Sequence, residues 1–463
     1  MYPISDEEHR LYVLDQIIND RGVLVDSELA EQAVKLNSIQ TAVAVEQAYM
    51  ITGLENPNSV TQLKQWLKEK GVEIESLSKK SVKSLADETD GDVSEMLKLR
   101  LLMAKTSVKK YEAVIRSVCS DNRVHGMMRF CGANRTGRWS GNILQPQNLP
   151  QNHLPDLTLA RDIVKDGDFE MLDMMFGNVP NVLSELIRTV LIPKPNHRFI
   201  VADFSAIEAR VLAWIAGEQW RIDTFKNGGD IYCASASKMF KVPVEKHGVN
   251  GELRQKGKIS ELACGYGGSV GALKNMGAVE MGVQENELQG LINDWRNANP
   301  HIVRFWYEVG NAAMKAIKEK TTVPLGKLVF AYERGILFIR LPSGRRLSYI
   351  KPRIGTNRFG GDSITYMGIN SAKKWDRLET FGGKLTENIV QGTARDLLAN
   401  ALINAANAGY DTVFHVHDEI ICEVPNGYGS VDELCKLMCI KPEWADGLPL
   451  NADGFECEYY KKE

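Results

Sequence analysis

The spacing of hydrophobic positions divides the chain into a helical first part and a mixed second part. Through residues 1 to about 128 these positions recur at helical spacing, with candidate helix caps at Ser5 and Asp26. The apolar run in HRFIVADFS, residues 197–205, predicts a strand, and helical patterns follow it. Strand-forming residues then dominate from about 322 to 352. The sequence therefore predicts a mixed α and β fold.

A second pattern near the end of the chain places charged residues inside apolar sequence. The segments Thr412–Val416 and Ile420–Val424 are both predicted strands, and His417, Asp418 and Glu419 lie between them. This triplet therefore falls at the bend of a predicted hairpin. Charged groups between buried strands carry a desolvation cost, so these three residues are candidates for function.

Composition and charge narrow the class of protein. The chain has 463 residues, of which 44% are hydrophobic and 25% are charged, and this length predicts two or three subdomains. The net charge of −3 gives no overall attraction to nucleic acid, so a polyanionic partner would need a local basic surface. The eight cysteines form no CxxC pair, and no segment approaches the roughly 18 apolar residues of a membrane span. We expect a soluble, cytoplasmic protein with reduced cysteines and no membrane partner.

Asp203 ends the first predicted strand, where a carboxylate is held rigidly enough to bind a metal ion. A structural alternative exists at the same place, because Ser205 and Glu208 have the spacing of a capping box. This segment alone favours the alternative. Together with the hairpin, however, Asp203 and Asp418 could hold two divalent ions about 4 Å apart, the arrangement that serves in-line phosphoryl displacement, with Glu419 assisting. Oxygen ligands favour Mg²⁺, with Mn²⁺ as a substitute.

The segment LRQKGKISELACGYGG, residues 253–268, is a candidate phosphate site. Arg254, Lys258 and Leu262 recur every four residues on one helical face, and Tyr266 follows near the helix end. Two cations one turn apart can grip a triphosphate, while the leucine and the tyrosine offer a surface for a base and a sugar. A basic, solvent-exposed helix face is the alternative, and this segment alone favours it.

Basic residues also cluster between Lys79 and Arg116. Their density, which includes Lys105, Lys109 and Lys110, suits a surface that follows a phosphate backbone. A solvated helix face is again the alternative, and it is the simpler interpretation of this segment alone.

Three of these segments, in this order, resemble family A DNA polymerases. DxSxxExR at Asp203–Arg210, RxxxKxxxxxxxYG at Arg254–Gly267 and HDE at residues 417–419 are similar to that family's motifs A, B and C. Further similar segments are TGRW (136–139), QNLP (147–150) and QGTARD (391–396). The resemblance covers essentially the whole chain and is closest to phage-like members.

The resemblance implies a right-hand polymerase fold with a palm built on an antiparallel sheet, helical fingers and a helical thumb. Residues 1–128 would form the thumb, 129–210 the first part of the palm, 211–370 the fingers and 371–463 the second part of the palm. The implied reaction is template-directed addition of deoxynucleotides to a primer 3′-hydroxyl by two-metal-ion nucleotidyl transfer, with release of pyrophosphate. It would take place in a bacterial cell or a phage-infected host.

The resemblance also implies a role for each candidate residue. Asp203 and Asp418 would bind two Mg²⁺ ions beside Glu419, and Lys258 would donate a proton to pyrophosphate. The incoming deoxynucleoside triphosphate would contact Arg254, Lys258, Leu262, Tyr266 and Glu208, the last of which closes the space for a 2′-hydroxyl. Primer-template DNA would contact Arg138, Gln147, Asn148, Gln391, His417, Lys105, Lys109 and Lys110.

Some features depart from the family pattern or leave alternatives open. Leu262 stands where an aromatic residue is frequent, which predicts altered discrimination among sugar-modified nucleotides, whereas Phe204 in place of tyrosine is a mild change. The chain begins almost at the thumb, so we expect no proofreading by this polypeptide; a separate exonuclease or a processivity factor would be a partner.

A single-subunit RNA polymerase is one alternative function, which Glu208 and the HDE triplet disfavour. A catalytically silent DNA-binding scaffold is the other, and the retained cluster of charges argues against it.

Overall fold

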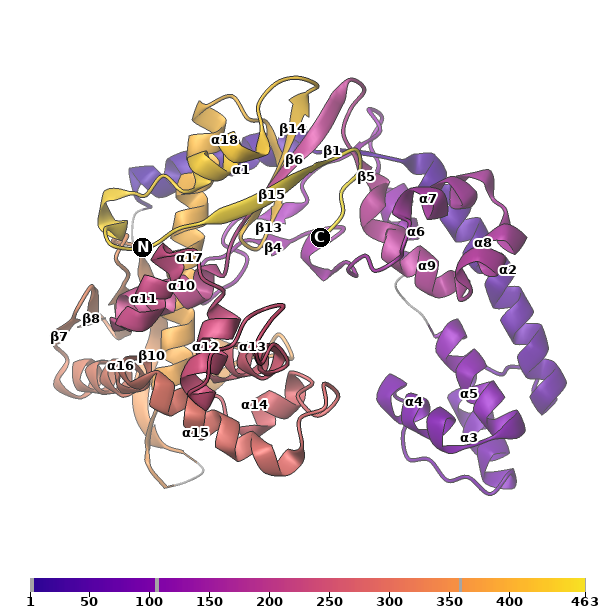
Figure 1. Cartoon of the computed structure of the whole chain (residues 1–463), viewed down its shortest axis with the longest axis horizontal. Helices are drawn as coiled ribbons and strands as arrows, with labels where there is room; N and C mark the ends of the chain where they lie inside the picture. The colour runs from indigo at the N-terminus through magenta and orange to yellow at the C-terminus, as the bar shows by residue number, and fades with distance from the viewer. Residues whose placement is uncertain (1–3, 105–107, 358–359, 463) are drawn as a thin grey trace.

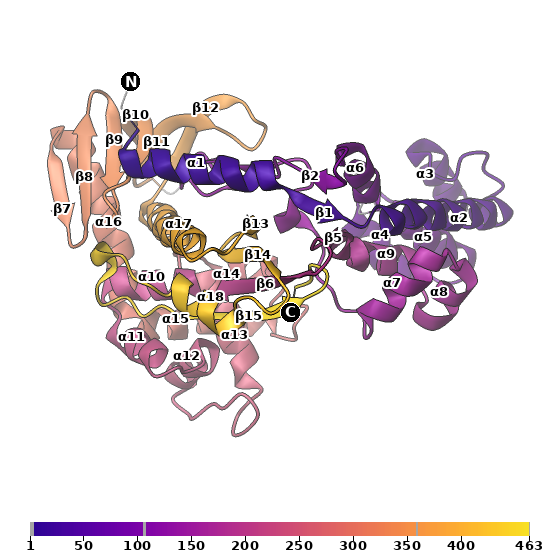
Figure 2. The ribbon, with the colours of Figure 1, turned by 90° about the horizontal axis from the view of Figure 1, so that it is seen from above.

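The computed structural model describes residues 4–104, 108–357 and 360–462. Figures 1 and 2 show a central sheet with a long helical arm on one side and, on the other, a helical lobe joined to a second sheet. The predicted mixed α and β fold is confirmed, and its sheets are antiparallel. None of the helices in these residues combines the length and the apolar character needed to cross a membrane.

The central sheet has the strand order β13, β14, β6, β15, and every neighbouring pair is antiparallel. Its strands are β6 (His197–Phe204), β13 (Thr412–Val416), β14 (Glu419–Pro425) and β15 (Ala452–Cys457). The strands predicted from the apolar runs are therefore confirmed, with β14 beginning one residue early. This order places β6, from the middle of the chain, between two strands from its end.

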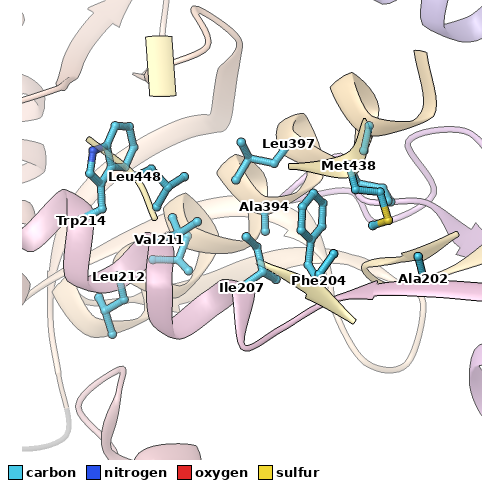
Figure 3. Close-up of a cluster of buried hydrophobic side chains, with 14 of the residues drawn as sticks. Ala202, Phe204, Ile207, Val211, Leu212, Trp214, Ala394, Leu397, Met438 and Leu448 are labelled. Atoms are coloured by element: carbon cyan, nitrogen blue, oxygen red, sulfur yellow. The ribbon is translucent and has the colours of Figure 1, made fainter. Parts of the chain in front are cut away.

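Both faces of the central sheet are covered, which explains the unbroken apolar run in β6. Phe199 and Val201 belong to a core shared with the helical arm. Ile200, Ala202 and Phe204 belong to the opposite core, part of which Figure 3 shows. Successive side chains of a strand point to opposite faces, so a strand buried on both sides needs apolar residues at every position.

Three helices cover the second of these faces and continue its core: α10 (Ile207–Ala216), α17 (Gly382–Asn407) and α18 (Val431–Met438). The longest of the three, α17, also contacts α1 (Asp6–Arg21), α16 (Pro300–Glu319) and β13. Ser5 caps α1, as predicted, because its hydroxyl accepts a hydrogen bond from the backbone N–H of Glu8 at 3.2 Å.

The helical arm combines helices from two stretches of the chain. Its helices are α2 (Ser27–Thr52), α3 (Val60–Glu69), α4 (Lys79–Glu88), α5 (Gly91–Met103), α6 (Lys109–Ser117), α7 (Leu157–Asp166), α8 (Phe169–Phe176) and α9 (Val179–Leu186). The long helix α2 contacts α5, α6, α7 and α9 and forms the axis of the arm. The predicted cap Asp26 is confirmed, since its side chain accepts from the backbone N–H of Leu29 at 3.0 Å.

The opposite lobe begins with α10 and joins the second sheet. Its further helices are α11 (Gln219–Lys226), α12 (Ile231–Phe240), α13 (Leu253–Cys264), α14 (Val270–Asn275), α15 (Leu288–Ala298) and α16 (Pro300–Glu319). The strands are β7 (Thr322–Leu325), β8 (Leu328–Glu333), β9 (Ile336–Arg340), β10 (Arg346–Thr356), β11 (Asp362–Ile369) and β12 (Trp375–Thr380). They pair in sequence order, and their buried face packs on α16 and α17. The predicted strand-rich segment is therefore confirmed and continues to Thr380.

Short elements connect these regions. They are β1 (Val23–Val25), β2 (Arg123–Val124), β3 (Met128–Arg129), β4 (Ser140–Gly141), β5 (Leu191–Ile192), η1 (Pro146–Asn148), η2 (Ile187–Val190), η3 (Glu285–Glu287) and η4 (Glu443–Ala445). The strands β2, β1 and β5 form a small sheet where the arm meets the rest of the molecule.

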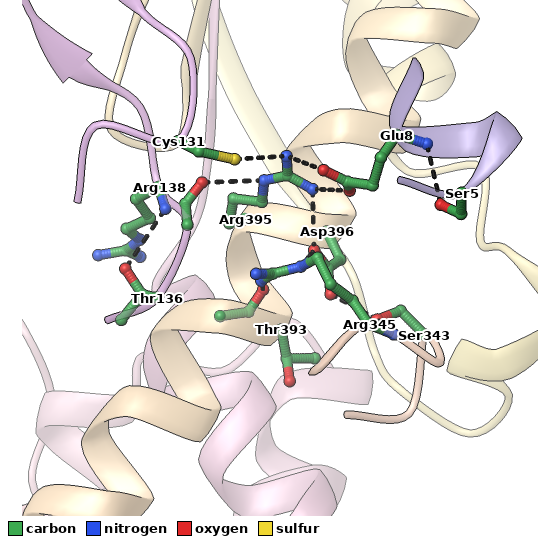
Figure 4. A network of polar contacts seen from close by, with 12 residues as sticks. Ser5, Glu8, Cys131, Thr136, Arg138, Ser343, Arg345, Thr393, Arg395 and Asp396 are labelled. Atoms are coloured by element: carbon green, nitrogen blue, oxygen red, sulfur yellow. Dashed lines mark hydrogen bonds and ion pairs between the residues drawn. The ribbon is translucent and has the colours of Figure 1, made fainter. Parts of the chain in front are cut away.

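A buried arginine ties α1 to α17 (Figure 4). Arg395 of α17 donates to the carboxylate of Glu8 at 2.5 and 2.9 Å and to the carbonyl oxygen of Gly137 at 3.1 Å. Asp396 lies 3.3 Å from the same guanidinium and also accepts from Arg345 at 2.6 Å. The Arg395 side chain is only 1% exposed, so its charge depends on these partners.

Removing the carboxylate of Glu8 should therefore destabilise the protein. We expect Glu8→Gln to lower the free energy of unfolding by about 2 kcal/mol, the scale of a hydrogen bond to a buried charged group. Urea unfolding followed by circular dichroism measures the change. Glu7→Gln, at an exposed acid of the same helix, is the matched control and should lie within about 0.5 kcal/mol of the wild type. Equal losses in the two variants would contradict the role given to Glu8.

Candidate active site

Acidic residues meet near the end of β6. In the register of the sheet, Asp203 lies opposite Glu419 of β14 and Asp453 of β15. The backbone N–H of Phe204 donates to the carbonyl oxygen of Asp418 at 3.2 Å and holds the hairpin bend beside β6. The fold thus brings Asp203, Asp418 and Glu419 together, although more than 200 residues separate the first from the others.

The bend between β13 and β14 consists of His417 and Asp418 alone, so the predicted hairpin is confirmed. His417 has a left-handed backbone conformation, with φ of 55°. A positive φ suits a two-residue turn between twisted strands, but it is strained for a residue that carries a Cβ. The turn leaves His417 exposed beside the carboxylate of Asp418.

The start of α10 directs Glu208 toward the same place. Ala206 is the N-cap residue, with φ of 50°, and no side chain caps the helix. The hydroxyl of Ser205 instead donates to Asp453 and accepts from Asn451 at 3.2 Å. The capping-box alternative for Ser205 and Glu208 is therefore wrong, because both side chains are engaged elsewhere.

Arg138 forms ion pairs with Glu208 of motif A and with Asp418 of the hairpin bend. Its guanidinium contacts Glu208 at 2.8 Å and Asp418 at 3.3 Å. The hydroxyl of Tyr266 donates to the other oxygen of Glu208 at 2.7 Å. Burial, followed by the charge of Glu208, raises the pKa of Tyr266 well above its usual range, so this tyrosine remains a hydrogen-bond donor. The result is a continuous chain of polar contacts from Tyr266 through Glu208 and Arg138 to Asp418.

A second cation, Lys462, contacts the other two acids of the cluster. The ammonium group of Lys462 is 3.0 Å from a carboxylate oxygen of Asp203 and 2.5 Å from one of Glu419. Tyr460 donates to the other oxygen of Glu419 at 2.7 Å and accepts from Arg188 at 3.0 Å. The sequence interpretation missed these three residues. Tyr460 and Lys462 reach the site because β15 pairs with β6, which returns the end of the chain to Asp203, whereas Arg188 comes from η2.

Burial controls the electrostatics of the cluster. It raises the pKa of Asp418 from 3.8 to about 6; Arg138 opposes the shift, while Glu208 and Asp203 add to it. Burial also raises the pKa of Glu419 against the opposing charge of Lys462. For Lys462 burial acts downward, but its two carboxylate partners outweigh it and raise the pKa, so the ammonium stays charged. Burial thus disfavours the charged form of Asp418 and Glu419, and the positive charges of Arg138 and Lys462 oppose this effect.

A cavity of about 450 Å³ opens over these groups. Its lining includes the candidates Asp203, Glu208, Leu262, Tyr266, His417 and Asp418, together with Lys462. Leu262, from α13, lines this cavity, and its residue is 52% exposed. A volume of this size is within the range of small-molecule sites.

Arg254 lies outside that cavity, in a neighbouring one of about 880 Å³. Both cavities are lined by Ala206 and Tyr232. The guanidinium of Arg254 is paired with Asp230 at 2.8 Å and lies over the ring of Tyr232. Lys258, one turn further along α13, is half-buried and makes no hydrogen bond or ion pair within the described ranges. Neither Arg254 nor Lys258 lines the cavity that holds Asp203 and Asp418.

The remaining candidates for DNA contacts are more widely distributed. Gln147 lines a small cavity with Arg138 and His417. Asn148 is exposed and donates to Gln145 at 2.9 Å, whereas Gln391 lies on α17 and donates to Glu387 at 3.5 Å. On α6 Lys109 is exposed, and burial, followed by the charge of Arg188, lowers the pKa of Lys110. Lys105 lies outside the described residues.

Comparisons with known proteins identify the family. The sequence model of DNA polymerase family A matches residues 27–439. A DNA polymerase of Bacillus phage SP02 is 52% identical over 461 residues, which is 99% of this chain and 71% of that protein. The thermostable DNA polymerase I of Thermus aquaticus is 27% identical over 265 residues, which is 56% of this chain and 27% of that protein.

A solved structure supports the same fold. The POL domain of Pol1 from M. smegmatis, in complex with DNA primer-template and dNTP, aligns with a TM-score of 0.67 at 20% identity and covers 98% of this chain and 70% of that chain. The fold is thus that of a right-hand polymerase, with the carboxylate-lined cavity at its central sheet. The chain belongs to DNA polymerase family A, whose members are DNA-directed DNA polymerases. The resemblance expected from motifs A, B and C is confirmed.

The raised pKa of Asp418 predicts a pH-dependent gain in stability when this residue is neutralised. Below a pH of about 4 the carboxyl is protonated in the folded and the unfolded state, so Asp418→Asn should change stability little. Above a pH of about 6 the folded wild type carries a disfavoured charge, which costs at most about 3 kcal/mol at 1.36 kcal/mol per pKa unit. Thermal unfolding with EDTA should give a higher Tm for the variant at pH 8 and a shrinking difference toward pH 4. A lower Tm for the variant at pH 8 would refute this.

Proposed function

We propose that this chain adds deoxynucleotides to a primer 3′-hydroxyl on a DNA template and releases pyrophosphate. The observation that carries the proposal is the meeting of Asp203 and Asp418 at the floor of a cavity that Tyr266 and Glu208 also line. The Pol1 neighbour was solved with primer-template and dNTP, which supports the same partners here. A phage relative of 52% identity supports action inside a phage-infected bacterial cell.

Asp203 and Asp418 hold two Mg²⁺ ions in this proposal, with Mn²⁺ as a substitute. The oxygens fit a hard cation, and the ammonium of Lys462 already lies 3.0 Å from Asp203 and 2.5 Å from Glu419. No group of three or more Asp, Glu, His or Cys side chains within the described ranges could hold an ion alone. Water and substrate phosphates would have to supply the remaining ligands. Ions bound by Asp203 and Asp418 would supply activation of the primer hydroxyl and stabilisation of the leaving oxygen.

The cavity residues select the nucleotide. Tyr266 borders the nascent base pair, and Glu208, held by Tyr266 and Arg138, closes the space that a 2′-hydroxyl needs. Arg254 and Lys258 grip the triphosphate, and Lys258 donates a proton to pyrophosphate. Arg254 is paired with Asp230, so binding of the triphosphate exchanges one anionic partner for another.

In this proposal residues 1–128 act as the thumb, 129–210 and 371–463 as the palm, and 211–370 as the fingers. The packing crosses these boundaries in two places: α1 packs on α17 and β13, and α7 and α9 pack on α2 in the arm. Arg138, Gln147, Asn148, Gln391 and His417 contact the primer-template near its end, and Lys105, Lys109 and Lys110 follow its backbone. Such contacts make DNA binding largely independent of sequence and sensitive to salt.

Primer extension tests the proposal. With a labelled primer, a DNA template and Mg²⁺, the wild type should extend with deoxynucleotides and not with ribonucleotides. Asp203→Asn and Asp418→Asn should each lower the rate by at least about 100-fold, because each removes a charge that acts on the reacting oxygens. Asp411→Asn, at an exposed acid beside β13, is the control and should extend normally.

Other outcomes would contradict the proposal in different ways. Efficient use of ribonucleotides would move the function to RNA synthesis. A folded protein that binds DNA without extending it would favour the scaffold alternative.

We also propose that this 463-residue polypeptide does not proofread. All of its long described elements belong to the three lobes. The test uses a primer with a mismatched 3′ nucleotide and no deoxynucleotides, and the primer should remain intact. Release of the mismatched nucleotide by pure protein would overturn this part of the proposal.

The exposed side chain of Leu262 allows a prediction of how the protein discriminates between deoxynucleotides and dideoxynucleotides. Leu262→Phe places an aromatic ring in the cavity, where it would meet the sugar of the incoming nucleotide. We expect the ratio of dideoxynucleotide to deoxynucleotide incorporation to change by about tenfold, the range that one side chain in a pocket can supply. Single-nucleotide incorporation kinetics measure the ratio. Equal ratios in variant and wild type would show that the side chain at position 262 does not contact the sugar.

A further inference from the structure

A cavity of about 30 Å³ lies behind the guanidinium of Arg138. Its lining includes Arg138, Trp139, Gln147, His415 and His417. The volume exceeds the roughly 10 to 15 Å³ that one water molecule needs, and the lining is polar on several sides. The cavity is thus large enough for water but too small for a nucleotide or an amino-acid side chain.

Buried polar atoms without partners border this space. Nε of Arg138 and both ring nitrogens of His415 are buried, and none of them has a hydrogen-bond partner in the described part of the chain. The His415 residue is only 1% exposed. Buried polar groups are nearly always hydrogen-bonded, because an unpaired one loses its hydration without compensation. Both residues line the same cavity, and each has a buried nitrogen that lacks a hydrogen-bond partner.

The ring of His415 is fixed in place. It packs edge-to-face against Trp139, with 4.8 Å between ring centroids and 83° between planes. The indole N–H of Trp139 in turn donates to Asp15 at 2.8 Å. Burial, with the charge of Arg395, lowers the pKa of His415 to about 3, so the ring is neutral and offers one acceptor and one donor nitrogen. A neutral ring can accept a hydrogen bond from a water molecule that itself accepts from Arg138.

We propose that water in this cavity bridges His415 to Nε of Arg138 and that His415 is a positioning residue for Arg138. The bridge fixes the guanidinium plane so that its remaining nitrogens meet Glu208 at 2.8 Å and Asp418 at 3.3 Å. The effect on synthesis rests on the proposed function, since Arg138 and Asp418 act there at the primer end.

A double-mutant cycle tests the bridge during synthesis. His415→Phe keeps the ring against Trp139 but has no nitrogen, and His415→Gln restores a polar group. We expect His415→Phe to lower the single-turnover rate about tenfold with little change in KM for the nucleotide, and His415→Gln to stay within about threefold of the wild type. In Arg138→Lys, which lacks Nε, His415→Phe should have almost no further effect. The same loss in both backgrounds would overturn the proposal, because it would show that His415 acts without Arg138.

A measurement without catalysis separates this inference from the proposed function. With ¹⁵N-labelled arginine, the Nε–H resonance of Arg138 is identified by its absence in Arg138→Lys. It should exchange slowly with solvent in the wild type and in His415→Gln, and shift and exchange faster in His415→Phe. His415→Leu serves for the same comparison if His415→Phe does not fold. An unchanged resonance in these apolar variants would refute the bridge even if DNA synthesis is normal. The expected shift in a protein that does not extend primers would retain the bridge and refute the proposed function instead.

Discussion

The structure depends on a group of like charges that is held in a partly buried position at the end of β6. Asp203, Asp418 and Glu419 gather where two strands and a hairpin meet, and burial disfavours their charge. Arg138 contacts Asp418 of this group, and Lys462 contacts Asp203 and Glu419. The carboxylates remain close together only because these cations offset their repulsion, and a site prepared in this way has a strong tendency to accept further cations.

The surrounding fold keeps this arrangement in place. The central sheet is covered on both faces, so its strands cannot shift register without exposing an apolar face. Helix α17 contacts α10 and α16 of the opposite lobe and β13 of the sheet, and it carries Arg395, whose partner Glu8 holds α1 against it. Burying the acids lowers the free energy of unfolding. Packing and ion pairs away from the cavity offset this loss, as is common at functional sites.

Sequence reasoning found the parts of the site that break a local pattern. Asp203 interrupts an apolar strand and Asp418 lies in a hairpin bend, so both could be recognised from their neighbours, as could the strands that carry them. Only the capping-box alternative for Ser205 and Glu208, which that segment alone favoured, is wrong, because the spacing cannot reveal that Asp453 and Arg138 engage these side chains. Lys462 could not be predicted, since its place depends on the pairing of β15 with β6 and no local pattern marks it.

We propose that the carboxylates bind metal cations and that the ammonium group of Lys462 lies against them until a metal ion binds. Titration with Mn²⁺, followed by electron paramagnetic resonance of the free ion, tests it most directly in the wild type, Lys462→Met and Asp203→Asn. We expect tighter Mn²⁺ binding by Lys462→Met, because the competing ammonium is gone, and much weaker binding by Asp203→Asn. Equal affinity in all three proteins would contradict it.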